Sequence, residues 1–366
     1  MRKIIAVAAV IVAAIIIGII LISVRETDTE VTRNQTKVGI IFNGSVEDHS
    51  WGQSHYEGMI QCADSLNLAV LYRENVPADE WCKEDMEELI EQGCKIIICN
   101  SFGYGEYALE MAREHSDIYF FHATGVQEEH NLATYFGRIY QMRYLSGIVA
   151  GLQTDTDEIG YVAAYPISEV NRGINAFTLG VRAVNPRAHV YVEWTQSWTG
   201  DMEAEEALNR LLAEHEIDVI TIHTDTNKPL QIAEERGIWS IGYNMDNAEL
   251  YPNTFLTAPV FEWEHFYEPH ILECLQGKFI GKHYWEGAES GIVALAPLSR
   301  NVKPGIEAQV EDARRKFFEG TFDVFYGPIT DTDGNVRIHE MECMTDDEML
   351  NAFDWYVEGV VVSGEE

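Results

Sequence analysis

The chain has 366 residues, of which 46% are hydrophobic and 11% aromatic, and its formal net charge at neutral pH is -35. This apolar content is too high for an intrinsically disordered chain, and the length is enough for two or three lobes of ordinary size. The strong negative charge repels nucleic-acid phosphates, so we expect no binding to DNA or RNA.

The first 24 residues differ in kind from the rest. Arg2 and Lys3 precede an unbroken apolar run over 4–22, which is long enough to cross the hydrocarbon core of a bilayer. The residues after this run make a poor cleavage site, and no cysteine stands there to carry a lipid. Because positive flanks stay in the cytoplasm, we predict an uncleaved signal anchor over 1–24 in the cell membrane. A polar tether over 25–35 would then hold an extracytoplasmic ligand-binding domain; cleavage of the anchor is the alternative.

The cysteines permit disulfides outside the membrane, but their spacing is irregular and contains no CxxC or Cys/His metal pattern. We therefore favour buried free thiols, with no metal and no cofactor. Cys94 and Cys99 are five residues apart on one expected strand, so we expect them to face opposite sides of it.

Short apolar runs alternate with helical stretches from residue 37 onward, and this order indicates parallel strands with right-handed crossovers. The pattern restarts at the polar stretch 154–157, which predicts a second unit of the same kind. The expected strands are 38–42, 69–72, 95–99 and 118–122 in the first unit and 159–163, 190–194, 219–223 and 239–242 in the second.

We therefore predict an α/β protein with two doubly wound parallel-sheet lobes joined by a hinge. The first lobe should cover 36–153 with part of 259–320, and the second should cover 154–258 with part of 321–366. A return crossing is expected near Leu256–Pro259. The turn at Asp333-Gly334 suits a hairpin between 322–326 and 335–338.

The stretch Lys37 to Met59, KVGIIFNGSVEDHSWGQSHYEGM, passes from a buried strand through a polar loop into a helix that begins with Trp51. Ligands of open α/β sheets bind at such strand ends. A large aromatic beside an acid and an imidazole suits a flat heterocycle, and the phosphate loops GxGxxG and GxxxxGK[ST] are absent from the sequence. The alternative is that Trp51 is a core residue and Asp48 a helix cap.

The loops at the ends of the other strands should meet that stretch in a cleft between the lobes, which closes on its ligand. Their aromatic content is high. The expected loops are 43–51, 100–104, 122–125, 165–171, 194–198, 223–225 and 243–246.

Several motifs, in the same order, resemble those of the basic membrane protein family of ABC-transporter substrate-binding proteins. DHSWGQSHYEG at 48–58 is similar to a branch with an Asp-His-x-Trp signature, and YFGRIYQMRYLSGIVAG at 135–151, GYNMD at 242–246 and DWYVEGV at 354–360 also match. The resemblance extends from residue 37 to residue 360. It implies a type I periplasmic-binding-protein fold and a purine nucleobase or nucleoside as ligand, delivered to an ABC permease.

Carried over by position, the resemblance implies that Trp51 stacks on the base. Asn43 and Asp48 then lie in the loop that contacts the ligand, and Phe102 is the aromatic of the second strand-end loop. Asp246 matches an acid that binds polar ligand atoms.

Two departures from the family pattern favour a free nucleobase over a nucleoside. Trp263 stands near the position at which many nucleoside binders have a lysine, and His122 replaces an aspartate. Trp198 is expected to line the cleft. His223 and Asp225 complete the expected ligand-binding set, although both could instead satisfy backbone groups at a strand end.

A second functional reading keeps the fold without the transport role. A membrane-anchored sensor or regulator would explain an anchor without a lipid-bearing cysteine, and it resembles an anchored regulator of competence in spore-forming bacteria. An enzyme is disfavoured, because we find no nucleophile elbow, no metal spacing and no paired acids with a clear role.

The topology can be tested directly. We expect the protein to fractionate with membranes and to lose its extracytoplasmic domain to external protease in spheroplasts, because the apolar run is long enough to span a bilayer. Recovery of a mature chain that starts near Glu26 and is free of the membrane would refute the uncleaved anchor.

Overall fold

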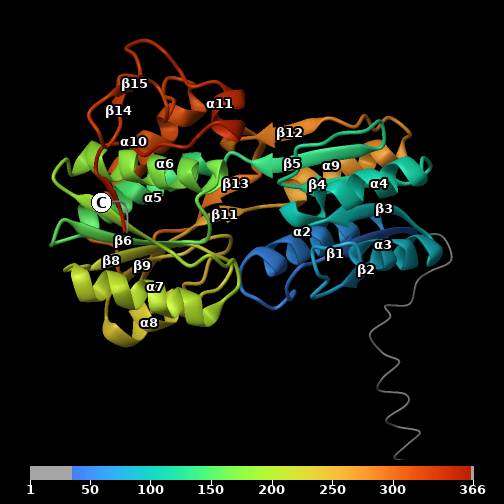
Figure 1. The fold of residues 1–366 in the computed structure, drawn as a ribbon, viewed down its shortest axis with the longest axis horizontal. Coiled ribbons are helices and arrows are strands. Elements are labelled where there is room, and N and C mark those ends of the chain that lie inside the picture. The colour runs from blue at the N-terminus through green and yellow to red at the C-terminus, as the bar shows by residue number, and fades with distance from the viewer. Residues whose placement is uncertain (1–34, 364–366) are drawn as a thin grey trace, which may run out of the picture.

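The computed structural model describes residues 35–363, which form two lobes side by side (Figure 1). The predicted anchor and all but the last residue of the predicted tether lie outside the described residues. Between residues 35 and 363, no helix is both long and apolar enough to cross a membrane.

The first lobe is built on a six-stranded sheet in the order β12-β5-β4-β3-β1-β2, in which every neighbouring pair is parallel. Helices α2 and α9 pack on one face of this sheet, and α3 and α4 pack on the other. The strands are β1 (Thr36–Ile41), β2 (Leu68–Arg73), β3 (Cys94–Cys99), β4 (Tyr119–Ala123), β5 (Leu132–Gly137) and β12 (His283–Glu286), and the helices are α2 (Trp51–Leu66), α3 (Cys82–Glu91), α4 (Gly105–Glu114) and α9 (Glu264–Leu275).

The second lobe repeats this plan with the parallel order β10-β9-β8-β6-β7-β16. Figure 1 shows α5 and α6 above this sheet and α7 and α8 below it. The strands are β6 (Glu158–Ala163), β7 (His189–Trp194), β8 (Val219–His223), β9 (Trp239–Ile241), β10 (Phe255–Thr257) and β16 (Val360–Val362), and the helices are α5 (Tyr140–Gln153), α6 (Ser168–Val184), α7 (Asp201–Glu214), α8 (Lys228–Arg236) and α10 (Ile306–Phe318).

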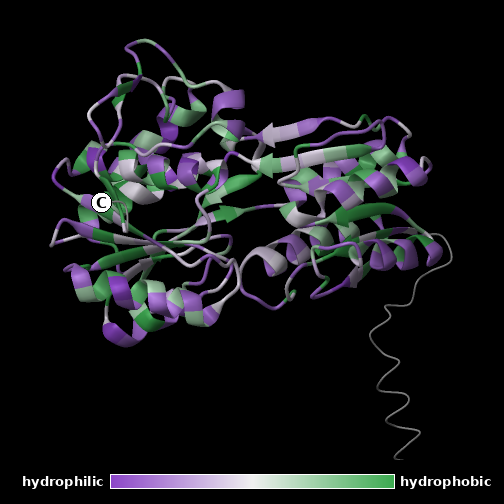
Figure 2. Ribbon diagram, viewed as in Figure 1, coloured by the Kyte–Doolittle hydropathy of each residue, from purple (hydrophilic) through white to green (hydrophobic). Residues whose placement is uncertain are grey.

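The strands form because their apolar runs can be buried on both faces, as parallel sheets require. In β1, Val38 and Ile40 belong to the core under α2 and α9, whereas Ile41 belongs to the core under α3 and α4. In Figure 2 many strand residues are hydrophobic, whereas the helices outside the sheets carry both hydrophobic and hydrophilic residues. The predicted two-lobed parallel α/β architecture is confirmed.

Within residues 35–363 the chain passes between the lobes three times: after β5, after β10 and after β12. The crossing after β10 leads into β11 (Pro259–Phe261), which pairs with β13 (Val293–Leu295) as an antiparallel ribbon. Helix α5 packs along α6 of the second lobe. The chain therefore changes lobe before Tyr140. The sequence pattern placed this change after residue 153, at a polar loop, but the crossing precedes helix α5 instead.

The contact between α5 and α6 depends on glycines. A Cβ atom at Gly147 would overlap the carbonyl oxygen of Phe177, and one at Gly180 would overlap that of Tyr144. The two helix backbones therefore touch directly, which no larger residue permits.

The C-terminal segment after α10 differs from expectation. The hairpin at Gly334 joins β14 (Ile329–Thr330) to β15 (Val336–Ile338), so residues 322–326 do not form its first strand. A short helix, α11 (Asp346–Asn351), follows, and the chain then adds β16 to the edge of the second sheet.

The six cysteines, all within the described residues, are free thiols, and Cys343 is the exposed one. The expectation that Cys94 and Cys99 face opposite sides of β3 was wrong, because both lie in the core under α3 and α4. The pairing register with β1 shifts between Cys94 and Ile96. The extra residue, Lys95, reverses the alternation of side chains at that point.

We predict that Gly147→Ala lowers the free energy of unfolding by about 1–3 kcal/mol, the usual cost of overpacking a close contact. Chemical denaturation followed by circular dichroism would measure it. Gly44→Ala is the matched control, because a Cβ at Gly44 meets nothing within 4 Å. Equal effects of the two substitutions would contradict the close approach of α5 and α6.

Candidate functional site

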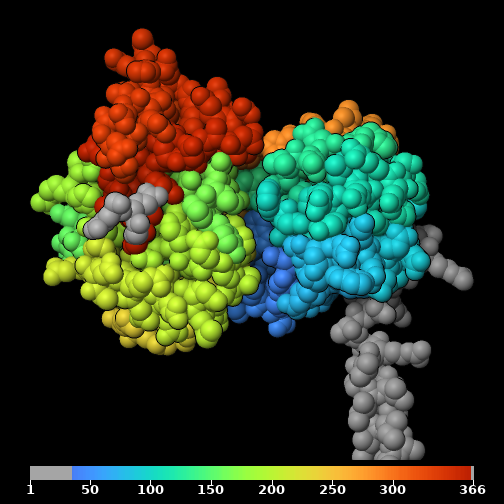
Figure 3. All heavy atoms as spheres, in the orientation of Figure 1, coloured from blue at the N-terminus to red at the C-terminus, as the bar shows by residue number. Residues whose placement is uncertain are grey.

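A cavity lies between the two lobes, which Figure 3 shows separated by a furrow on the surface. It holds about 510 Å³ of space, solvent at its mouth included. Its wall is made by residues that follow strands, as expected for the carboxyl edge of a parallel sheet. The lining residues are Asn43, Trp51, Ser101, Phe102 and Thr124 from the first lobe and Ile167, Glu169, Trp198, Asp225 and Tyr243 from the second. Each of the seven predicted strand-end loops contributes at least one of them.

Trp51 is both a wall of the cavity and part of the core, so the two alternatives raised by the sequence are combined. Its side chain is 8% exposed, and its indole Nε1 donates a 2.7 Å hydrogen bond to the carbonyl oxygen of Asn100. Behind it lie His55, at 4.4 Å between ring centroids, and Trp263, at 5.4 Å. The ring that faces the cavity is thus held in one orientation.

Asp48 acts as the cap of α2. Its carboxylate accepts hydrogen bonds from the backbone N–H groups of Ser50, Gly52 and Gln53, at 2.8, 2.8 and 2.9 Å. Burial nevertheless raises its pKa above the ordinary value. Asp48 lines a hollow beside the cavity rather than the cavity itself.

Three asparagines of the opposite lobe, Asn227, Asn244 and Asn247, donate hydrogen bonds to the loop before Trp51. We call these three residues the asparagine clasp. The side-chain amides of Asn227 and Asn247 donate to the carbonyl oxygen of His49, at 2.8 and 3.1 Å. The amide of Asn244 donates to Ser50 Oγ at 2.9 Å. These bonds cross the cleft, so they hold the lobes together at the rim of the cavity.

Two carboxyl groups face the cavity from the second lobe, and both have raised pKa values. Burial raises the pKa of Asp225 well above its usual range, and the nearby acids Asp48 and Glu169 raise it further. Burial also raises the pKa of Glu169, against the opposing effect of the Arg172 and Arg143 cations. A protonated carboxyl can both donate and accept a hydrogen bond.

Arg143 supports this wall from behind. It is fully buried, donates to the carbonyl oxygen of Ile222 at 2.8 Å, and places its guanidinium 3.9 Å from the ring centroid of Tyr243. Such a cation–π contact fixes the aromatic ring that it covers. Tyr243 is therefore a positioned wall of the cavity.

The structure brings together five of the ten residues expected from the sequence and separates the others from the cavity. Asn43, Trp51, Phe102, Trp198 and Asp225 line the cavity, and Asp48 lies at its edge. The remaining four predicted residues do not line it: His122, His223, Asp246 and Trp263.

The reasons differ among these four. His122 and His223 are buried, and each is hydrogen-bonded within its own lobe, to the carbonyl oxygen of Ser101 and to the hydroxyl of Tyr161. Trp263 is fully buried behind Trp51. Asp246 is exposed and accepts a hydrogen bond from its own loop.

Sequence reasoning missed five of the ten lining residues: Ser101, Thr124, Ile167, Glu169 and Tyr243. All five lie in loops that the sequence placed at the cleft, so the loops were identified but not the side chains that face inward. In residues 35–363, no group of His, Cys, Asp and Glu side chains is arranged to hold a metal ion.

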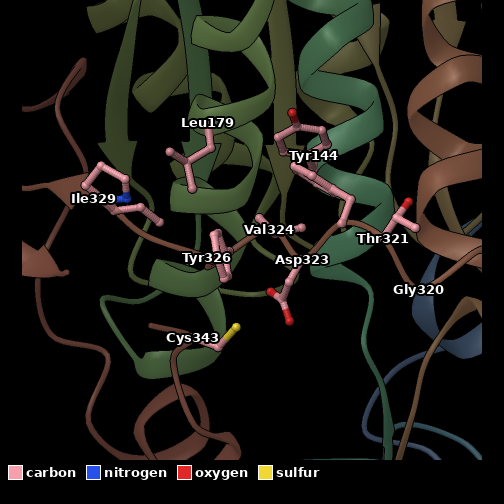
Figure 4. Close-up of a pocket in the computed structure, with 11 residues that line it drawn as sticks. Tyr144, Leu179, Gly320, Thr321, Asp323, Val324, Tyr326, Ile329 and Cys343 are labelled. Carbon is pink, nitrogen blue, oxygen red and sulfur yellow. The ribbon is translucent and has the colours of Figure 1, made fainter. Parts of the chain in front are cut away.

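A larger hollow lies on the second lobe, away from the cleft (Figure 4). Tyr144 of α5 and Leu179 of α6 form one side, and the C-terminal segment with Tyr326 and Cys343 forms the other. Asp323 is its single charged lining residue. Because it lacks converging polar groups, we do not regard it as the ligand site.

Residues 35–321 match the family model described as "Bmp: ABC transporter substrate-binding protein PnrA-like". A purine-binding protein of Brucella abortus is 31% identical over 326 residues, which cover 88% of this chain and 92% of that protein. A putative ABC transporter glucose-binding protein of Haloferax volcanii is 32% identical over 289 residues, which cover 78% of this chain and 73% of the relative.

Among solved structures, a transcriptional activator of the comK gene from Bacillus halodurans is similar, with a TM-score of 0.69 and 23% identity. The match covers 77% of this chain and 98% of the activator. At this identity the likeness shows the fold alone, which is the type I periplasmic-binding-protein fold expected from the sequence.

Asp225 yields a prediction about pH. The pKa of Asp225 in the folded state is raised above its ordinary value of 3.8. At pH values above 3.8, Asp225 therefore binds more protons in the folded protein than in the unfolded chain. Its stability contribution therefore falls as the pH rises through the window between these two pKa values. We expect Asp225→Asn to remove this fall, as measured by denaturant unfolding at a series of pH values.

Asp246→Asn is the control for the loss of one negative charge, because Asp246 is exposed on the same lobe. If the free energy of unfolding changes with pH in the same way for wild type and Asp225→Asn, the pKa of Asp225 is not raised by folding.

Proposed function

Because the chain belongs to the Bmp family of PnrA-like ABC transporter substrate-binding proteins, which are not enzymes, we propose that it captures a purine nucleobase or nucleoside. The protein would hold the ligand in the interlobe cavity outside the cell membrane and deliver it to an ABC permease.

The observation that carries the proposal is the combination of aromatic lining residues with two partly buried carboxyl groups. Trp51, Phe102 and Tyr243 offer ring faces, and stacking a base on an aromatic side chain contributes about 1–3 kcal/mol. Glu169 and Asp225 offer donors and acceptors for the ring N–H groups and exocyclic groups of a heterocycle. A mismatched ligand would cover these polar groups and leave them unpaired, which is a strong basis for discrimination.

The charge around the cavity argues against nucleotides. Glu169 and Asp225 are acids, and no lysine or arginine is among the residues that line the cavity. In the hollow beside it, which Asp48 lines, the one cation is Lys228, whose ammonium lies 3.6 Å from the Glu205 carboxylate. A phosphate placed in the cavity would meet these acids and no lining cation to pair with.

A binding screen tests the proposal. The purified full-length chain, in mild detergent, is assayed by thermal shift and calorimetry against bases, nucleosides, nucleotides, glucose and amino acids. We expect adenine, guanine or their nucleosides to raise the melting temperature, because a ligand of the folded state stabilises it by mass action. Stabilisation by glucose or an amino acid, with none by a purine, would overturn the proposal. No response at all would favour the anchored-regulator alternative.

Phe102 offers a clean variant, because its side chain is 61% exposed and lines the cavity. We expect Phe102→Ala to weaken purine binding by about tenfold, the loss of one stacking contact, while the melting temperature of the empty protein stays unchanged. Trp51→Ala is less informative, since burial of Trp51 means that its removal also destabilises the fold. Trp81→Ala, at an exposed residue outside the cavity, is the control.

A further inference from the structure

The segment 322–363, which we call the C-terminal strap, is fixed to the second lobe. Asn171 of α6 donates its side-chain amide to the carbonyl oxygen of Phe353 at 2.9 Å. Arg172 of the same helix donates to the carbonyl oxygen of Met349 at 2.6 Å, and β16 pairs with β7 at the edge of the second sheet. The strap lies beyond residue 321, at which the match to the family model ends.

Arg138, by contrast, is fixed to the first lobe. Its backbone N–H donates to the carbonyl oxygen of Glu286 at 2.7 Å, and its Nε donates to that of Trp285 at 3.0 Å. Both acceptors lie at the end of β12. Arg138 stands between β5 and Tyr140, so it is bonded to the first lobe just before the chain changes lobe.

The strap and Arg138 meet across this change of lobe. The Arg138 guanidinium donates to both carboxylate oxygens of Asp346, at 2.9 and 2.5 Å. Such a two-bond pair is stronger and more directional than a single hydrogen bond. Asp346 begins α11, and a capping box between Thr345 and Glu348 closes the N-terminus of this helix.

Trp285 adds a second contact between the lobes at the same place. The guanidinium of Arg138 lies 4.0 Å from its ring centroid, and that of Arg172, from the second lobe, lies 5.0 Å away. Both distances are within the range of cation–π attraction. A rotation of one lobe against the other would separate Arg138 from Asp346 and Arg172 from Trp285.

These contacts are separate from the ligand cavity, because Arg138, Trp285 and Asp346 do not line it. They are also separate from the asparagine clasp, which bonds the loop at residues 48–50. Their effect on the lobes is therefore present with or without a ligand.

We propose that the C-terminal strap holds the two lobes closed through the pair of Asp346 with Arg138, and so sets how readily the cleft opens. The side chains of these two residues are 58% and 21% exposed, and salt screens a pair that solvent reaches. The cleft should therefore open more readily as the ionic strength rises.

Double electron–electron resonance on the empty full-length protein, in mild detergent, tests the proposal. Spin labels are placed at Glu80→Cys and Met202→Cys, exposed positions of the first and second lobe, in a Cys343→Ser background, since the other native thiols are buried. We expect Asp346→Asn to raise the ratio of open to closed protein by about two- to fivefold, the effect of losing one partly exposed ion pair. Asp346→Arg should raise it further, because two cations would then face each other.

Asp347→Asn is the matched control, because Asp347 is exposed in the same turn of α11 and bonds within that helix, to Asn351. High salt should move the wild type toward the distances of Asp346→Asn and leave that variant unchanged. Arg138→Lys keeps the charge without the two-bond geometry, so it should also open the lobes, and it decides the question if Asp346→Asn unfolds α11.

The same distance distribution in wild type, Asp346→Asn and Arg138→Lys would overturn the proposal. So would an equal shift in Asp347→Asn, which would assign the effect to the stability of α11 and not to the pair. The measurement uses no ligand, so its outcome is independent of the proposed purine function.

Discussion

The site depends on one short loop, residues 48–50, that is bonded from both sides. Within its own lobe, the Asp48 carboxylate accepts hydrogen bonds from three backbone N–H groups at the start of α2. The first N–H groups of a helix have no partner within the helix. From the other lobe, the asparagine clasp bonds the carbonyl oxygen of His49 and the hydroxyl of Ser50. The start of α2, which carries Trp51, is therefore bonded both within its own lobe and from the opposite lobe.

In the proposed function, this arrangement would couple ligand capture to closure of the lobes. A hydrogen bond contributes about 0.5–1.5 kcal/mol net, so the asparagine clasp by itself offers modest stabilisation of the closed form. A ligand that contacts Trp51 in one lobe and Asp225 in the other adds to the same interface, and it shifts the equilibrium by its differential affinity for the closed form. Asn244 connects the two effects, because its amide donates to both Ser50 and Asp225.

Two walls of the cavity, Trp51 and Tyr243, are held in place by buried groups behind them. Trp51 lies on His55 and Trp263, which are stacked on each other at 4.1 Å between centroids. Burial lowers the pKa of His55 well below its usual range, so the imidazole is a neutral packing group. Tyr243 lies against the buried Arg143 guanidinium. A preorganised site of this kind loses little conformational entropy when a ligand binds.

The sequence by itself determined the two-lobed parallel α/β plan, the family and the strand-end loops that build the cleft, since strand period, chain order and motifs are local properties. Its position after a strand indicated Trp51, and the family resemblance indicated Phe102; both line the cavity. The sequence could not show which side chains within a loop turn inward, so Glu169 and Tyr243 were missed and Asp246 was chosen, although it points to solvent. Nor could it assign α5 to the second lobe, because that depends on the contact of Gly147 with α6. Only the tertiary structure decided these points, since they depend on packing between segments far apart in the chain, as does the pairing of α11 with Arg138.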